Sequence, residues 1–183
     1  LIGVGLLGGS IGMAARQRGV AGRVTGLVRR TESVQECLDA GAVDDATLDL
    51  AEAVGGAALV ILCTPVGGMK ALAEEIQPHL APDTVVTDVG SVKASVVAEV
   101  EPLLPRFVGS HPMAGSEQTG VANARADLFE NTVCAVTSTD QSDTACVTRL
   151  NEFWTALGSH VISLPAAEHD TIVARTSHLP HVL

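Results

Sequence analysis

The stretch LIGVGLLGGS, residues 1–10, decides the fold of this chain. Its glycines have the spacing Gly-x-Gly-x-x-Gly, at Gly3, Gly5 and Gly8, and they follow the apolar pair Leu1-Ile2. In a dinucleotide-binding fingerprint the first glycine makes a tight turn, the second lets the backbone approach a pyrophosphate, and the third lets helix and strand pack closely. A helical pattern follows at once, so the stretch predicts a dinucleotide site. The alternative is a tight turn with only a structural role.

The start of the helix after this loop is expected to bind phosphate. Free N–H groups and the positive end of the dipole make a helix N-terminus attractive to anions. We therefore expect the backbone at Leu6 and Leu7 to contact the cofactor, and the hydroxyl of Ser10 to add a further donor.

Apolar runs and amphipathic stretches alternate along the whole chain, which is typical of βαβ units in a doubly wound, mostly parallel sheet. The runs predict strands at 1–2, 24–28, 58–63, 84–88, 107–109, 133–137 and 160–164. Helical patterns lie at 10–18, 32–40, 67–79, 92–103, 142–157 and from 166 onward. We expect Thr31 to be an N-cap residue, and Gly41 and Gly158 to end the helices before them.

The composition supports this fold class and excludes some classes of binding partner. The chain has 183 residues, of which 46% are hydrophobic and only 2% aromatic, which suits helices on a buried parallel sheet. A net charge of −10 argues against nucleic acid and anionic membrane surfaces, so we expect a small molecule or another protein as partner. No apolar run is long enough to cross a bilayer. Four scattered cysteines without metal-ligand spacing predict buried, reduced thiols and a cytoplasmic location: Cys37, Cys63, Cys134 and Cys146.

The two ends of the chain suggest a piece of a longer protein. The chain opens on an apolar pair directly before a glycine turn, and it closes on SHLPHVL without a helix-stop signal. We expect residues 1–164 to form a dinucleotide-binding domain and residues 165–183 to begin a second, helical domain.

The end of the second strand distinguishes the two nicotinamide cofactors. An NAD site usually has Asp or Glu there to hold the ribose 2′-hydroxyl. Here Val28 is followed by Arg29 and Arg30. Arginine pairs with phosphate through two hydrogen bonds and stacks on adenine, so the pair favours a 2′-phosphate, and therefore NADP over NAD. A solvated basic pair is the alternative.

Two further strands end at the edge where such folds bind ligands. Cys63, Thr64 and Pro65 end one strand, and Thr64 is expected to touch the ribose or phosphate, unless this is an ordinary turn. Asp88 ends the other strand and has either a site role or a purely structural one. Ser91 is the better candidate for a hydroxyl that faces the nicotinamide.

One of the six histidines lies among small residues that would let a ligand or the backbone come close to it. His111 lies in GSHPMAGSEQTG, residues 109–120, before a proline and among small residues. A neutral imidazole can accept the proton of an alcohol while the hydride leaves, so His111 is the candidate base. His178 belongs to a second cluster near the chain end. We interpret His79, His160 and His169 as surface or helix-end residues. We expect no metal, because the helix-spaced pair His178 and His181 lacks a carboxylate partner and would make a poor zinc site.

Five stretches together resemble the prephenate and arogenate dehydrogenases of tyrosine biosynthesis, over essentially the whole chain. They are GVGLLGGS (3–10), ILCTPV (61–66), TDVGSVK (87–93), GSHPMAGSEQTG (109–120) and TSHLPH (176–181). HPMAG combined with SHLPH is far more specific than the glycine loop alone. The GLVRR stretch is similar to the NADP-using arogenate dehydrogenases of the cyanobacterial kind.

The resemblance implies oxidative decarboxylation of prephenate or arogenate, which differ only at the side chain remote from the reacting ring. It implies that His111 accepts the hydroxyl proton and that Ser91 orients His111, the substrate hydroxyl or the nicotinamide. It further implies that His178 lines the substrate pocket and that Ser116 contacts substrate. A C-terminal helical domain after Leu183 would make a homodimer and supply an arginine for a substrate carboxylate.

Two other functions remain as alternatives. One is another NADP-dependent dehydrogenase, of the β-hydroxyacid or imine-reducing type, although these usually rely on a lysine or lack a base histidine. The other is a non-catalytic NADP-binding module that regulates a partner.

Overall fold

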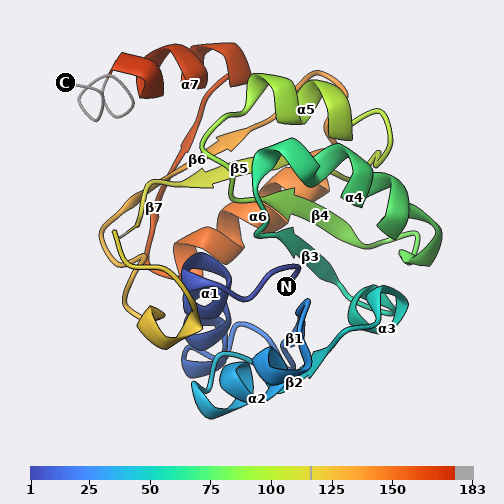
Figure 1. Ribbon diagram of the computed structural model, residues 1–183. Coiled ribbons are helices and arrows are strands. Elements are labelled where there is room, and N and C mark those ends of the chain that lie inside the picture. The colour runs from blue at the N-terminus through green and yellow to red at the C-terminus, as the bar shows by residue number, and fades with distance from the viewer. Residues whose placement is uncertain (116, 176–183) are drawn as a thin grey trace.

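The computed structural model describes residues 1–115 and 117–175, with strands at the centre and helices on both faces (Figure 1). This confirms the doubly wound α/β fold expected from the sequence. The elements in chain order are α1 (Leu6–Gln17), β1 (Thr25–Leu27), α2 (Thr31–Asp39), β2 (Asp45–Thr47), α3 (Leu50–Val54), β3 (Leu59–Leu62), η1 (Val66–Gly68), α4 (Met69–Ile76), η2 (Gln77–His79), β4 (Val85–Asp88), α5 (Ala94–Val100), β5 (Gly109–Pro112), η3 (Val121–Asn123), β6 (Val133–Thr137), α6 (Thr144–Ala156), β7 (His160–Ser163) and α7 (Ala166–Val173).

The strands β1, β2, β3 and β4 run parallel to one another. β1 pairs with β2, and β3 pairs with β4 in a register that sets Leu59 opposite Val85. Ile2 joins the two pairs through parallel bridges to Leu27 of β1 and Leu62 of β3. The glycine loop after Ile2 therefore starts at the middle of the sheet, at the carboxyl ends of its neighbours.

The remaining strands continue from β4. Phe107 forms a parallel bridge with Val86, β5 pairs antiparallel with β6, and β6 pairs parallel with β7. The strand predicted at 107–109 is thus displaced toward the C-terminus, because pairing with β6 extends through the polar residues Ser110 and His111, which an apolar pattern does not mark. His111 consequently lies beyond the carboxyl end of β4.

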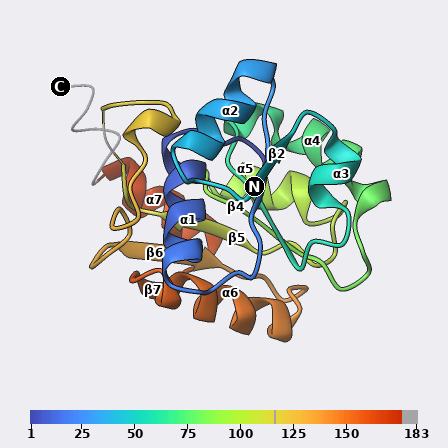
Figure 2. The same cartoon turned by 90° about the horizontal axis from the view of Figure 1, so that it is seen from below.

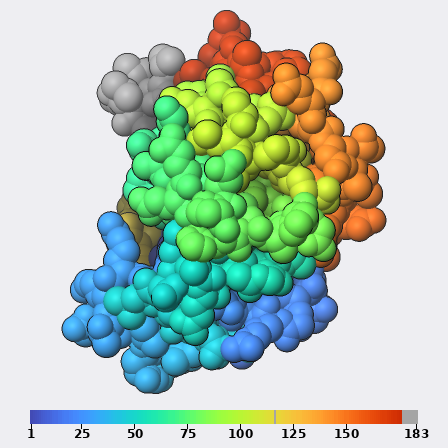
Figure 3. Space-filling view, turned by 90° about the vertical axis from the view of Figure 1, so that its right-hand side faces the viewer, coloured from blue at the N-terminus to red at the C-terminus, as the bar shows by residue number. Residues whose placement is uncertain are grey.

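Alternate residues of a strand face opposite layers, and this places the two halves of the core. In β3, Val60 and Leu62 pack with α3, α4 and α5, whereas Ile61 packs in the cluster that contains α1 and α6. Figure 2 shows α5 and α6 on opposite sides of the strands. Residues of α3 to α5 make up much of the face in Figure 3. At the upper margin of this face, α7 packs against α5.

A short strand and a short α-helix were not predicted, and neither was the single helical turn η3. β2 has only partly buried residues, and α3 is a helix of five residues in a polar segment, so neither leaves a clear hydrophobic period. Asp49 starts α3 by accepting a hydrogen bond from Glu52 N at 3.0 Å. Local capping and strand pairing, rather than apolar patterning, form this part of the chain.

Several helices begin at other residues than the sequence predicts, and two of these starts have a clear structural cause. α1 begins at Leu6 rather than Ser10, because the helix takes in the glycines that pack against the loop. The N-cap of α2 is Arg30, and Thr31 is already helical, so the N-cap prediction for Thr31 is wrong. The predicted stops are confirmed: Gly41 and Gly158 have φ of +68° and +99° and follow α2 and α6.

Candidate active site

The glycine loop lies between the carboxyl ends of β1 and β3. Gly3 N donates to Leu27 O at 3.1 Å, and an ideal Cβ on Gly3 would lie only 3.0 Å from Cys63 O. Gly3 has a φ of +90°, in the region that favours glycine. Both the turn and the close approach of β3 therefore require glycine here.

The loop leaves room for a phosphate in front of α1. An ideal Cβ on Gly8 would lie 2.1 Å from Gly3 O, whereas no described atom lies within 4 Å of one on Gly5. Within residues 1–115 and 117–175 no side chain caps this twelve-residue helix, and its first turn contains no acid. The N–H groups of Leu6 and Leu7 in this first turn suit the pyrophosphate of a dinucleotide.

A buried hydroxyl beside the loop also fits a dinucleotide. Thr64 Oγ1 is buried and has no hydrogen-bond partner among the described residues. Leaving such a group unpaired costs on the order of 1–3 kcal/mol, and a ribose or phosphate oxygen would satisfy it. Burial raises the pKa of the adjacent Cys63 thiol to about 12, so this side chain is neutral at physiological pH. Pro65 directly precedes the short helix η1.

Ser10 has a packing role in this structure, contrary to the expectation that it donates to phosphate. Its side chain has no exposed surface, and its Oγ accepts a hydrogen bond from Arg125 N at 3.0 Å. The segment around η3 folds over α1, and Ala124 lies against Gly9. This long-range contact covers Ser10, so its hydroxyl does not face the open side of the loop.

The arginine pair stands at the same edge, directly after β1. Arg29 and Arg30 are both exposed. Arg30 lies 3.2 Å from Ser33 Oγ and 3.7 Å from Glu36 Oε2, contacts that contribute little at a surface. Arg29 forms no ion pair within residues 1–115 and 117–175. The pair is therefore accessible to an anionic ligand.

A buried ion pair lies next to the strand that carries His111. Lys93 Nζ donates to Asp88 Oδ2 and, at 2.8 Å, to Ser110 O, and both ionic side chains have no exposed surface. Asp88 also accepts hydrogen bonds from Gly90 N at 2.8 Å and from Ser110 N at 3.2 Å. Burial raises the pKa of Asp88 and lowers that of Lys93, while their mutual attraction opposes both shifts. The pair joins the ends of β4 and β5 and positions the backbone of His111.

His111 is hydrogen-bonded to a second histidine. Its Nδ1 lies 2.9 Å from His169 Nε2, and His169 Nδ1 lies 2.8 Å from Asp170 Oδ1. The interpretation of His169 as a surface or helix-end residue is wrong, because its side chain has no exposed surface. It lies on α7, on the same face as the buried Val173 four residues later. That helical spacing is the signal that could have revealed it.

The structure leaves three predicted site residues as predictions. Ser91 is exposed in the segment between β4 and α5, two residues before Lys93. Ser116 and His178 lie outside the described residues. Lys93, by contrast, was not singled out from the sequence, although it belongs to the TDVGSVK stretch that was.

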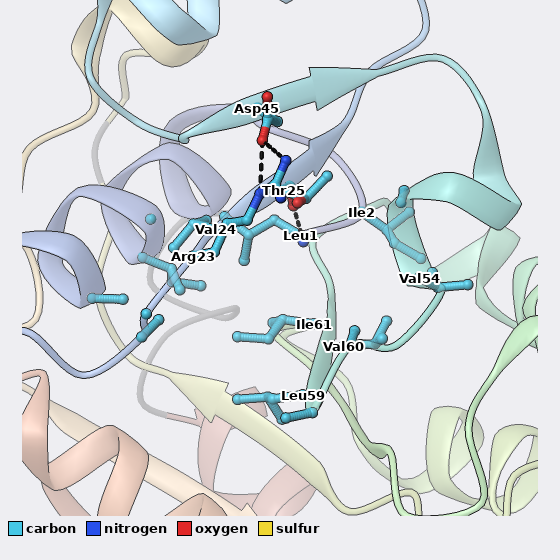
Figure 4. Close-up of a pocket in the computed structure, with 18 of the residues that line it drawn as sticks. Leu1, Ile2, Arg23, Val24, Thr25, Asp45, Val54, Leu59, Val60 and Ile61 are labelled. Atoms are coloured by element: carbon cyan, nitrogen blue, oxygen red, sulfur yellow. Dashed lines mark hydrogen bonds and ion pairs between the residues drawn. The ribbon is translucent and has the colours of Figure 1, made fainter.

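A pocket of about 1130 Å³ lies at the opposite end of the central strands (Figure 4). Residues 23–25 and 57–61, at the amino ends of β1 and β3, line it on two sides. Leu1 stands between them, and its backbone N donates to Thr25 O at 2.7 Å. Open α/β sheets bind ligands at the carboxyl ends of their strands, so this pocket is not part of the candidate site.

Comparison of the sequence and the fold with known proteins identifies the family of this chain. A family model described as prephenate dehydrogenase, nucleotide-binding domain, matches residues 11–163. The chain belongs to the prephenate dehydrogenase family. This confirms the resemblance inferred from the sequence motifs.

Relatives of the family share both sequence and backbone with this chain. Prephenate dehydrogenase of Bacillus subtilis (strain 168) is 35% identical over 187 residues, covering 100% of this chain and 50% of the relative. The crystal structure of prephenate dehydrogenase from A. aeolicus in complex with hydroxyphenyl propionate and NAD+ has a TM-score of 0.94 at 32% identity, covering 99% of this chain and 64% of that one. Synechocystis arogenate dehydrogenase has a TM-score of 0.92 at 33% identity, covering 98% and 63%. The chain thus spans between half and two thirds of the length of these relatives.

Metal sites and membrane-spanning helices are both absent from the described segments of this chain. Within them, no group of three or more His, Cys, Asp or Glu side chains is arranged to hold a metal ion. No described helix combines the length and the apolar character needed to cross a membrane. All four cysteines are free, and Cys63 is only partly buried, whereas the other three are buried as expected.

Two alanine substitutions separate cofactor binding from packing in the family's glycine loop. Gly5→Ala adds a methyl group to open space, so we expect unchanged thermal stability and at least tenfold weaker dinucleotide binding, because the methyl group occupies the path of the pyrophosphate. Gly8→Ala forces a methyl group onto Gly3 O and should lower stability by about 1–3 kcal/mol. Calorimetry with NAD and with NADP measures binding, and thermal unfolding measures stability. Unchanged affinity for both dinucleotides in Gly5→Ala would mean that the phosphates bind elsewhere.

Proposed function

We propose that this chain forms the dinucleotide-binding part of an enzyme that oxidatively decarboxylates prephenate or arogenate and transfers a hydride to NADP. The observation that carries the proposal is the position of His111, at the carboxyl edge that holds the glycine loop, with its Nδ1 hydrogen-bonded to His169. An imidazole held in this way beside a dinucleotide loop can act as a general base.

In the proposed reaction His111 accepts the proton of the ring hydroxyl. A bound nicotinamide would supply the hydride acceptor for the same ring carbon. The ring carboxylate then leaves as carbon dioxide, and the electron pair of the broken bond restores the aromatic ring. Ser91 orients His111, the hydroxyl or the nicotinamide, while Ser116 and His178 contact the substrate.

Formation of reduced nicotinamide with prephenate and with arogenate tests this function. We expect turnover of at least one of the two and none with β-hydroxyacids. Reaction with a β-hydroxyacid but with neither cyclohexadiene would identify the protein as a dehydrogenase of that other type. NADP binding without turnover of any of them would favour the non-catalytic regulatory module.

NADP is the proposed cofactor because Arg29 and Arg30 replace the ribose-binding carboxylate. Hydrogen bonds to a charged group are worth about 1.5–3 kcal/mol, roughly tenfold or more in affinity for each arginine. Replacing both arginines by alanine should therefore weaken NADP binding at least tenfold and leave NAD binding nearly unchanged. Calorimetric titration with each cofactor measures the two effects, and equal losses would rule out the 2′-phosphate contact.

The wider organisation is proposed from the same resemblance. Residues 1–164 would form the dinucleotide-binding domain, and residues 165–183 would begin a helical domain that builds a homodimer and completes the substrate pocket. A cytoplasmic location is proposed because the cysteines are free, as thiols are in a reducing compartment.

A further inference from the structure

We propose that His169 and Asp170 act together as positioning residues that hold His111 in the tautomer with the proton on Nδ1 and the lone pair on Nε2. The proposal deepens the proposed function, since it assigns the basic nitrogen of the proposed base. It rests on a chain of hydrogen bonds that can be followed atom by atom from α7 to β5.

The chain starts at the carboxylate of Asp170, whose position is set by the backbone of α5. Its Oδ1 accepts a hydrogen bond from Lys93 N at 2.7 Å, and its Oδ2 accepts one from Ala94 N at 2.9 Å. The N-cap residue of α5 provides no side-chain cap of its own, so Asp170 caps this helix from α7. Oδ1 also faces His169 Nδ1, at 2.8 Å.

Asp170 is held as a carboxylate. Burial opposes its ionisation, but the hydrogen bonds from Lys93 N, Ala94 N and His169 outweigh that effect, and the pKa of Asp170 lies below its ordinary value. The positive end of the α5 dipole acts in the same direction. An ionised carboxylate only accepts hydrogen bonds, so His169 Nδ1 must donate to it.

Because His169 Nδ1 is a donor, the positions of the protons on the rings of His169 and His111 can be assigned. A neutral imidazole carries one N–H and one lone pair. With its proton on Nδ1, His169 has a lone pair on Nε2, which lies 2.9 Å from His111 Nδ1. His111 Nδ1 must then be the donor, and the lone pair of His111 lies on Nε2.

This arrangement prepares His111 for proton transfer. Nε2 can take the substrate proton while Nδ1–H keeps its bond to His169, so the ring need not turn during the reaction. The imidazolium that forms on His111 is then hydrogen-bonded to the neutral ring of His169, which is hydrogen-bonded to the carboxylate of Asp170. Through His169, the carboxylate orients the ring of His111 and stabilises its positive charge, as the acid does in an acid–histidine–nucleophile triad. Among nearby charges, Lys93 is paired with Asp88 and does not oppose it.

The tautomer can be read directly from nitrogen-15 spectra of the histidine rings, without substrate or turnover. In the unmodified chain at neutral pH we expect the His111 resonances of a protonated Nδ1 and an unprotonated Nε2. His169→Phe should shift them toward the Nε2–H tautomer that an unrestrained imidazole prefers. His169→Gln should restore part of the original pattern, because its amide oxygen can accept from Nδ1–H. The matched control is His160→Gln on the exposed strand β7, which should change nothing.

Kinetics supply a second readout where the protein turns over substrate. His169→Phe should lower kcat roughly 10–100-fold, the usual scale for a residue that orients a reacting group, with little change in the KM for NADP. A His111 spectrum with its proton on Nε2 in the unmodified chain would overturn the proposal, as would an unchanged spectrum in His169→Phe. Because the spectra need no substrate, absence of turnover with a protonated Nδ1 would count against the proposed function and not against the positioning role.

Discussion

His111→Asn is expected to lower kcat/KM by roughly 10²–10⁴, the usual contribution of general base catalysis, with nearly unchanged NADP affinity. Asparagine keeps a hydrogen-bonding group of similar reach but cannot accept a proton at neutral pH. The acid limb of the pH–rate profile should disappear with the imidazole, because only the neutral ring of His111 can take the substrate proton. Steady-state rates across pH, together with calorimetric titration of NADP, measure both effects.

The control for this prediction is His178→Asn, which removes the other motif histidine. We expect it to raise the KM for the substrate and to retain the acid limb, since its proposed role is to line the substrate pocket. An acid limb that persists in His111→Asn and vanishes in His178→Asn would show that the base is assigned to the wrong histidine.

Lys93→Met is expected to destabilise the fold by about 3–5 kcal/mol, because it leaves the carboxylate of Asp88 buried without its cation. For a domain of this length, that loss corresponds to a fall in Tm of ~10 °C. Urea unfolding gives the free energy and thermal unfolding gives the Tm. Lys70 is the only other lysine in the chain and is exposed on α4, so Lys70→Met is the matched control and should stay within about 0.5 kcal/mol.

A double variant distinguishes two causes of the stability lost in Lys93→Met: an unpaired buried charge and the loss of side-chain packing. Asp88→Asn combined with Lys93→Met removes both charges while keeping an amide oxygen that can accept from one of the two backbone donors, Gly90 N or Ser110 N. We expect the double variant to recover part of the stability lost in Lys93→Met. A double variant that is clearly less stable than Lys93→Met alone would show that loss of the ion pair is not the reason for the destabilisation.

Features that depend on near neighbours were predictable from the sequence. The glycine loop has to turn, admit a ligand and start a helix within eight residues, so the spacing of Gly3, Gly5 and Gly8 specifies both its conformation and its place after a strand. Gly41 and Gly158 end helices for an equally local reason, since left-handed backbone favours glycine. Periodicity likewise predicted most strands and helices.

Features made by contacts between distant segments were decided only by the tertiary structure. Ser10 is covered by a segment 115 residues away, and His169 reaches a histidine 58 residues away, so the surrounding sequence identifies neither partner. Lys93 looks like an ordinary helix-start residue until β4 and β5 enclose it. The sequence by itself determined the fold class, the dinucleotide loop and the candidate base. Tertiary packing decided which side chains surround that base, because hydrogen bonds and burial depend on distance in space and not along the chain.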